Sequence, residues 1–275
     1  MIHLIIGKNS NLSKLLHKNI KNTYLISSKN VQNELNTIDF QKYKTINIVF
    51  NNFQISTKLN DLSNPSEYIS RSIMTTAIVL EYIKKHNLNI NKIIYTSSSS
   101  VYGNNELCHE SDALQPLSLH SSLKIANERL IASFCNENRI DYTITRIFNM
   151  YGGDDHFSIV SKIVNAYKQD KILNIFNRGT ATRDFIHIND VVEVYKTLLT
   201  DKINANILNL GRGIEMSVAN LIDFLQEHNI TIKTKSKSRS ELKKSTADVS
   251  KLLEIMGERE FIQISDFLLE KIKEN

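Results

Sequence analysis

Cysteine, proline and glycine are scarce in this sequence, which has two, two and eight of them among 275 residues. Cys108 and Cys135 have neither the spacing of metal ligands nor a repeated pattern, so we expect no disulfide framework and no metal site. Two free thiols are typical of a reducing compartment, here the cytoplasm. No stretch approaches 18 consecutive apolar residues, and the apolar start MIHLII lacks a basic leader. We therefore expect no membrane span and predict a first strand there.

The charge is nearly balanced, which narrows the class of partner. The 34 Lys and Arg against 29 Asp and Glu are spread along the chain, apart from one basic run at 233–244. A nucleic-acid site would interleave aromatic residues with such charge, and the run contains none. We expect the run to be a solvated face and the protein to have no nucleic-acid partner. A dinucleotide or a sugar nucleotide, each a small polyanion, fits the charge as well.

Strand and helix patterns alternate along the chain. A strand at 3–6 ends at Gly7, and the segment 11–20 carries leucines at helical spacing, an opening typical of dinucleotide-binding folds. Strands are also expected at 24–26, 46–50, 93–95 and 142–148, with helices between them. Pro65 starts a long helix whose core stripe is expected to comprise Ile69, Ile73, Ala77 and Leu80. The 275 residues and the 41% hydrophobic content suffice for one large α/β domain, or for a large lobe that carries a small one.

A cluster of hydroxyl and titratable side chains follows the strand at 93–95. Four serines occupy 97–100, at the carboxyl end where open α/β sheets bind ligands. Pro116 is expected to open a helix on which His120 and Lys124, four residues apart, share one face. A hydroxyl, an imidazole and an ammonium together indicate a proton-transfer site. Lys124 should lower the pKa of His120 below its usual value, so a reduction that needs the imidazolium should fade above neutral pH.

The string SSSSVYG, followed by Pro116, His120, Lys124 and Glu128, resembles the extended short-chain dehydrogenase/reductase family of nucleotide-sugar enzymes, of the NAD-dependent epimerase/dehydratase type. The resemblance implies that Ser98 is the catalytic Ser or Thr and Lys124 the lysine of Tyr-x-x-x-Lys. His120 stands where the family has its tyrosine. The implied fold is a Rossmann-type doubly wound parallel α/β sheet with a small C-terminal α/β substrate lobe. We expect residues 1–150, with returning segments at about 176–210, to form the dinucleotide domain, and 151–275 to form most of the lobe.

The resemblance also assigns a cofactor turn. The turn GKNSNLS occupies the place of the family's three-glycine fingerprint, with Gly7 kept and Ser10 and Ser13 in place of the other two glycines. We assign Gly7, Ser10, Asn11, Leu12, Ser28, Lys29 and Lys124 to cofactor binding. No carboxylate follows the strand at 24–26, and Ser28 and Lys29 suit a 2′-phosphate, which favours NADP over NAD. An ordinary strand-helix turn without a cofactor is the alternative.

The second half of the chain carries the expected substrate residues. RIFNMYG resembles the family's R-x-x-N-x-Y-G and implies that Asn149 contacts the substrate, while Arg146 is either functional or part of a structural salt bridge. TRDFIHINDVV resembles R-D-F-[IV]-H-V-x-D-V and assigns Arg183 to the nucleotide diphosphate, with Asp190 a candidate helix cap. Arg239 resembles the arginine of R-x-x-D, although Leu242 replaces its acidic residue. With Ser98, these three residues are the expected substrate site: Asn149, Arg183 and Arg239.

Three functions stay open at this point. The first is an NAD(P)-dependent reductase of a 4-keto-6-deoxy sugar nucleotide for surface polysaccharide (O-antigen or capsule), similar to dTDP-4-dehydrorhamnose reductase or CDP-paratose synthase. The second is a nucleotide-sugar 4-epimerase. The third is a family member without catalysis that binds a nucleotide or a partner protein. Dehydratase chemistry is disfavoured, because Ser99 and Ser100 replace the Asp-Glu pair that follows the catalytic residue in 4,6-dehydratases. The resemblance also suggests a homodimer.

Overall fold

The computed structural model describes residues 1–52, 63–201, 203, 205–257 and 259–274, and the chain forms two compact units. Unit 1 comprises Met1–Gly103, Leu114–Arg146 and Val192–Leu208. Unit 2 comprises Asn104–Ala113, Ile147–Val191 and Asn209–Asn275. Residues 104–113 thus belong to unit 2, although they precede the expected domain boundary at residue 150.

A twisted sheet with parallel strands forms the core of unit 1, in agreement with the predicted Rossmann-type class. Its described strands, in sheet order, are β10 (Ile207–Leu210), β6 (Asp141–Ile147), β4 (Ile90–Ser98), β3 (Ile46–Phe50), β1 (Ile2–Ile6) and β2 (Thr23–Ile26). All five side chains of β1 and of β3 are buried, as expected of strands covered on both faces. The strand order reverses between β1 and β3, which makes their carboxyl ends the place where doubly wound sheets bind ligands.

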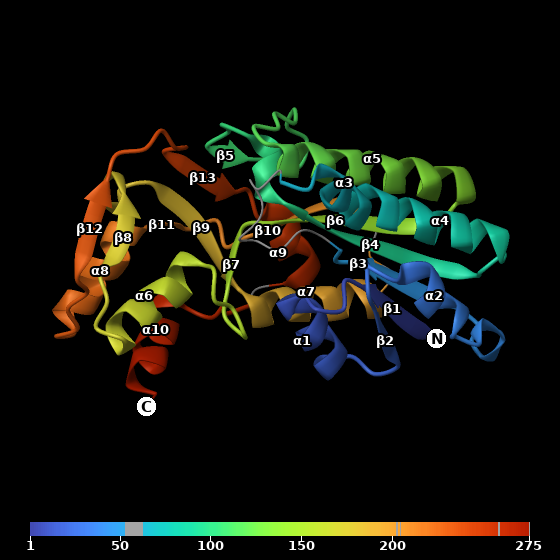
Figure 1. The fold of residues 1–275 in the computed structure, drawn as a ribbon, viewed down its shortest axis with the longest axis horizontal. Coiled ribbons are helices and arrows are strands. Elements are labelled where there is room, and N and C mark those ends of the chain that lie inside the picture. The colour runs from blue at the N-terminus through green and yellow to red at the C-terminus, as the bar shows by residue number, and fades with distance from the viewer. Residues whose placement is uncertain (53–62, 202, 204, 258, 275) are drawn as a thin grey trace. The chain divides into compact units, whose positions relative to one another are not determined.

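Helices cover both faces of this sheet. They are α1 (Asn11–Asn19), α2 (Val31–Asn36), α3 (Pro65–Ile69), α4 (Thr75–Lys85), α5 (Leu119–Asn138) and α7 (Ile188–Thr200). Figure 1 shows α4 and α5 along one face, with α1 and α7 along the other. Strands β1, β3 and β4 and helices α4 and α5 contribute most of the buried apolar side chains of this core.

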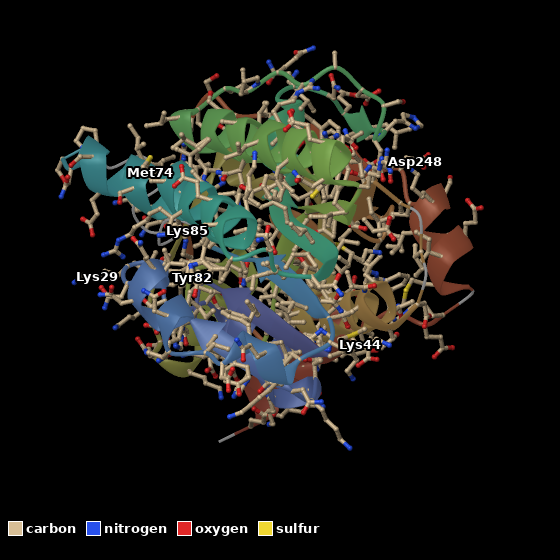
Figure 2. The ribbon with its side chains drawn as sticks, turned by 90° about the vertical axis from the view of Figure 1, so that its right-hand side faces the viewer. Lys29, Lys44, Met74, Tyr82, Lys85 and Asp248 are labelled. Carbon is tan, nitrogen blue, oxygen red and sulfur yellow. The ribbon has the colours of Figure 1, made fainter. Side chains whose placement is uncertain are left out.

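The helix predicted from Pro65 differs from the expectation. A π-helical turn, Ser70–Met74, separates α3 from α4 and rotates the face that follows. The predicted stripe is correct only in part: Leu80 is buried, Ile73 and Ala77 are half-buried, and Ile69 is 41% exposed. The other buried positions are Tyr68, Ser72, Thr75, Thr76, Val79, Tyr82 and Ile83. Met74 lies at the surface, whereas Tyr82 is buried and donates a hydrogen bond to Leu35 O in α2 (Figure 2).

Unit 2 contains a second, mixed sheet and its own core. Its strands are β5 (Leu107–Cys108), β7 (Asn149–Tyr151), β8 (Leu173–Phe176), β9 (Thr182–His187), β11 (Glu215–Ser217), β12 (Thr234–Lys237) and β13 (Lys244–Ala247). Strand β9 is central, with β11 antiparallel to it and both β13 and β7 parallel to it, while β12 pairs with β8. The helices are α6 (Ile159–Lys168), α8 (Val218–Glu227), α9 (Ser250–Met256) and α10 (Ile264–Lys273), and α10 packs against α6 and α8.

Asp190 attaches the C-terminal segment of unit 2 rather than capping a helix. It lies in the first turn of α7, and its carboxylate accepts hydrogen bonds from Arg259 Nη2 at 2.9 Å and from Ile262 N at 3.0 Å. The candidate role as an N-cap is therefore not the one observed. Both bonds fix the chain just before α10, and so Asp190 is a structural residue.

Candidate active site

Strand β4 ends at Ser98, and each serine there has a distinct environment. Ser97 is 3% exposed, and its hydroxyl donates to the Glu128 carboxylate on α5. Ser98 is half-buried and caps a short 3-10 helix, Ser99–Tyr102, because its Oγ accepts from Ser100 N at 3.2 Å. The hydroxyl proton of Ser98 stays available for another acceptor. Of the two, Ser98 is the one that a ligand can reach.

Helix α5 begins at Leu119 rather than at Pro116. Ser118 is its N-cap, and Ser118 and Ser121 form a reciprocal capping box, which satisfies backbone N–H groups at the helix start. His120 therefore lies in the first turn, half-buried, and Lys124 lies one turn later, 5% exposed. The helical spacing that the sequence predicted for these two residues is present.

Lys124 is held against the end of β4. Its Nζ donates to Thr96 O at 2.6 Å and lies 5.0 Å from the centre of the Tyr95 ring. Burial lowers the pKa of Lys124 to about 7, against a smaller opposing effect of Glu128. Since Thr96 precedes Ser98 by two residues on β4, this hydrogen bond connects α5 to the strand that ends at Ser98.

His120 is neutral near pH 7. Burial lowers its pKa to about 4, and the positive charge of Lys124 adds to that shift. The predicted direction of the Lys124 effect is confirmed, but burial is the larger cause. An imidazole with such a pKa accepts a proton transiently and returns it readily.

A buried ion pair fixes the orientation of α5. Arg146 Nη2 on β6 lies 2.8 Å from Glu128 Oε2, and both side chains are 3% exposed. Arg146 Nη1 also donates to the Tyr102 hydroxyl at 3.0 Å. Of the two roles considered for Arg146, the structural salt bridge is the one observed. The ion pair with Ser97 and Tyr102 joins α5, β4 and β6 at the level of the serine cluster.

The turn after β1 fits the pyrophosphate of a dinucleotide. Gly7 has a φ of +109°, and a Cβ there would meet Asn51 O at 2.3 Å, so only glycine is accommodated. Ser10 caps α1, and Asn11 begins that helix, which places backbone N–H groups at an anion-binding terminus. Leu12 is 1% exposed, so its side chain belongs to the core and only its backbone is available to a cofactor.

A carboxylate that the sequence analysis did not identify lies at the end of β2. Glu34 on α2 accepts a hydrogen bond from Ser27 N at 2.9 Å, so an acidic side chain does lie at this strand end. Lys29 is exposed in the same loop, as Figure 2 shows, and Ser28 O accepts from Thr75 Oγ1 at 3.2 Å. The premise that no carboxylate is present here is wrong, because α2 folds back over the loop. The seven-residue separation of Ser27 and Glu34 concealed the contact.

The substrate residues expected in the second half lie in unit 2. Asn149 on β7 donates to Asp184 O at 3.0 Å. Arg183 on β9 donates to Thr182 O at 2.7 Å, and its Nη2 lies 3.6 Å from Glu241 Oε2. Burial lowers the pKa of Arg183, an effect that Glu241 partly offsets.

Arg239 is connected to Arg183 through two further residues. Its guanidinium lies 5.0 Å from the centre of the Phe176 ring. Asn177 accepts from Arg239 N at 3.0 Å and donates to Glu241 Oε1 at 2.8 Å. Because Glu241 also pairs with Arg183, the main chain at Arg239 is linked to the Arg183 side chain through Asn177 and Glu241.

Two further observations hold for the described residues. Among them, no group of three or more His, Cys, Asp or Glu side chains is arranged to hold a metal ion. In that same part of the chain, no helix has the length and apolar character needed to cross a membrane. Cys108 and Cys135 are both buried free thiols.

Known proteins resemble this chain over half of its length or more, and the chain spans less than two thirds of the human and Staphylococcus aureus relatives described below. The family model described as "NAD dependent epimerase/dehydratase family" matches residues 8–211. UDP-glucuronate 4-epimerase of Thermodesulfobacterium geofontis is 28% identical over 249 residues, which cover 84% of this chain and 76% of that protein. Human dTDP-D-glucose 4,6-dehydratase is 30% identical over 151 residues, 52% of this chain and 43% of that protein. Protein CapI of Staphylococcus aureus is 28% identical over 218 residues, and the match spans 64% of its length.

Solved structures share the fold. UDP-glucuronic acid 4-epimerase from Bacillus cereus, in complex with UDP-glucuronic acid and NAD, has a TM-score of 0.84 at 21% identity and covers 99% of this chain and 98% of its own. At that identity the likeness establishes the fold, which agrees with the doubly wound sheet predicted from the sequence. With the match of the family model over residues 8–211, the chain belongs to the NAD dependent epimerase/dehydratase family.

Proposed function

We propose that this protein is an NAD(P)-dependent enzyme that oxidises and reduces a sugar carbon of a nucleotide sugar. The observation that carries the proposal is the half-buried His120 and the buried Lys124 on one face of α5, with Lys124 fastened to the strand that presents Ser98. A bound nicotinamide dinucleotide would supply the redox chemistry. The protein side chains would bind the sugar and move the proton of its hydroxyl group.

A 4-epimerase suits the resting state of His120 best. A neutral imidazole can accept the proton of the sugar hydroxyl while the carbon is oxidised, and can return it when the carbon is reduced from the other side. The proton is conserved over the cycle, so no resting imidazolium is required. Ser98 would donate its free hydroxyl proton to the same sugar oxygen, and the Lys124 charge would keep the imidazolium acidic enough to release its proton.

A 4-ketoreductase is the second candidate, and a different observation favours it. A ketone reduction consumes a proton, which the resting enzyme must hold. Burial lowers the pKa of Lys124 to about 7, so this lysine can exchange protons with solvent near neutral pH and could pass one to His120. The substrate would then be a 4-keto-6-deoxy sugar nucleotide of surface polysaccharide synthesis. The Ser99-Ser100 sequence still disfavours a dehydratase.

We assign the diphosphate of the substrate to Arg183 and Arg239 and a sugar-side contact to Asn149. The planar guanidinium forks grip phosphate oxygens in pairs. Glu241 lies beside the Arg183 guanidinium, and Asn177 binds both Glu241 and the main-chain nitrogen of Arg239. Asn149 is fastened by its side-chain nitrogen to Asp184 O, so its side-chain oxygen is the atom free to accept from a sugar hydroxyl.

Product analysis separates the candidates. The purified protein is incubated with UDP-, dTDP- and CDP-sugars, with NAD or with NADPH, and products are identified by NMR. Formation of a 4-epimer without net cofactor consumption supports the epimerase, and stoichiometric NADPH oxidation on a 4-keto sugar supports the reductase. Binding of NAD and nucleotide sugars without turnover would support the non-catalytic family member instead.

A further inference from the structure

Two serines and one asparagine form a compact cluster where the strand order reverses. Asn51 follows β3, and its Nδ2 lies 2.6 Å from Ser10 Oγ and 2.9 Å from Ser13 Oγ in the turn and first helix after β1. Ser10 and Ser13 are the residues that stand in place of the second and third glycines of the fingerprint. The substituted side chains are therefore engaged by a third residue from the neighbouring strand end.

The hydrogens that each group carries determine which atom donates in these hydrogen bonds. An amide nitrogen carries two hydrogens, and Asn51 gives one to each serine. Ser10 Oγ also accepts from Ser13 N at 3.4 Å, so both of its lone pairs are used and its own proton remains. Among the residues that the structure describes, neither hydroxyl donates to a protein acceptor.

The two hydroxyls differ in exposure. Ser13 is 0% exposed, so its hydroxyl faces the interior and serves to anchor the amide of Asn51. Ser10 is half-buried at the start of α1, beside the terminal N–H groups of a nine-residue helix. Only the Ser10 proton can reach a ligand, and the helix terminus favours a negatively charged one.

We propose that Asn51 is a positioning residue that turns Ser10 into a donor to a phosphate oxygen of the dinucleotide. This inference rests on the proposed dinucleotide-dependent function. A glycine at position 10 would offer close backbone approach to the pyrophosphate, and serine obstructs that approach by its Cβ. The charge-assisted hydrogen bond from the oriented hydroxyl offsets the loss.

Calorimetric titration with NAD, ADP and adenosine tests the role of Ser10. In Ser10→Ala, the dissociation constants for NAD and ADP should rise roughly tenfold, since a hydrogen bond to a charged group is lost. The constant for adenosine, which has no phosphate, should stay unchanged. Ser158→Ala is the matched control, because Ser158 caps α6 in unit 2 by the same kind of bond and its loss should leave all three constants unchanged.

Asn51→Asp tests whether Asn51 acts through Ser10. The carboxylate has the same shape but no hydrogens to give, so it should take the Ser10 proton for itself and weaken ADP binding roughly tenfold or more. In the Ser10→Ala background, the same substitution should add less than a further threefold. Equal weakening in both backgrounds would mean simple charge repulsion and would overturn the proposal, as would unchanged ADP binding in Ser10→Ala. If the parent protein binds no dinucleotide, the proposed function is overturned together with this inference. If the parent binds NAD and ADP and the variants bind them equally well, only this inference is overturned.

Discussion

The Nζ atom of Lys124 donates a 2.6 Å hydrogen bond to the main-chain oxygen of Thr96, so a buried lysine is fastened directly to the strand that ends at Ser98. The low pKa of Lys124 follows from the same burial. The proposed role of Lys124 in proton transfer requires its charge, and that charge is costly to bury. The cost should be measurable as a dependence of stability on pH.

Lys124→Met should therefore change how stability depends on pH. Between pH 7 and 10.5 the unfolded parent binds a proton on Lys124 that the folded parent does not, so the parent free energy of unfolding should rise with pH across that window. The methionine variant should lack this contribution, and its stability relative to the parent should fall by about 2 kcal/mol from pH 7 to pH 9. Urea unfolding at several pH values measures the difference. Lys42→Met, at an exposed lysine, is the control and should show no such trend.

The Glu128–Arg146 pair should show strong coupling. Glu128→Met or Arg146→Met alone leaves a buried charge without its partner and should cost about 3–5 kcal/mol of unfolding free energy. The double variant should recover much of that loss, because two apolar side chains replace two charges. Denaturant unfolding of all four proteins gives the coupling energy. If each single variant lowers the unfolding free energy by less than about 1 kcal/mol, the ion pair does not hold α5 in place.

Cofactor choice should depend on two residues at the end of β2. Lys29→Asp should weaken NADPH binding more than NADH binding, because the exposed lysine suits a 2′-phosphate. Glu34→Gln should weaken NADH more than NADPH if the carboxylate receives the ribose hydroxyl. Fluorescence titration with both cofactors decides between them. The variant with the larger selective effect identifies the preferred cofactor, and unchanged affinities in both variants would remove this strand end from the cofactor site.

Arg183→Ala should weaken nucleoside diphosphate binding. Loss of charge-assisted bonds worth roughly 1.5–3 kcal/mol should raise the dissociation constant for UDP, dTDP or CDP by about tenfold or more. Arg178→Ala is a suitable control, because Arg178 is an exposed arginine nearby in the chain. Calorimetry on both variants gives the comparison. Equal affinity in the parent and in Arg183→Ala would contradict the assignment of Arg183 to the substrate diphosphate.

Much of the fold could be predicted because apolar runs and helix caps are local features. The predicted strand at 46–50 agrees with β3 in full, and the helix at 11–20 ends one residue early. The helix after Pro65 could not be predicted in detail, because the buried face follows from a π-helical turn that no single residue encodes. Likewise Ser118, a cap inside a serine-rich loop, set the start of α5 instead of the more conspicuous Pro116.

The candidate site likewise contains residues that local sequence patterns predicted and residues that they did not. His120 and Lys124 were predicted together because their spacing of four is a helical property. Glu34 and Asn51 were missed, because each acts across a turn on a residue from another element. The signal for Asn51 was present in principle, since two serines in place of two glycines leave hydroxyls at a crowded turn that some partner must satisfy.

The most direct test of the account is the turnover of His120 variants on the nucleotide sugar that the parent converts. His120→Phe should lower turnover by about 100-fold or more, since general acid-base catalysis contributes 10²–10⁴-fold, and should bind NAD as the parent does. His120→Tyr, which introduces the family residue, should retain or exceed the parent rate. A His120→Phe protein as active as the parent would contradict the assignment of proton transfer to His120. An inactive parent that gains turnover only as His120→Tyr would instead identify a nucleotide-binding protein without catalysis.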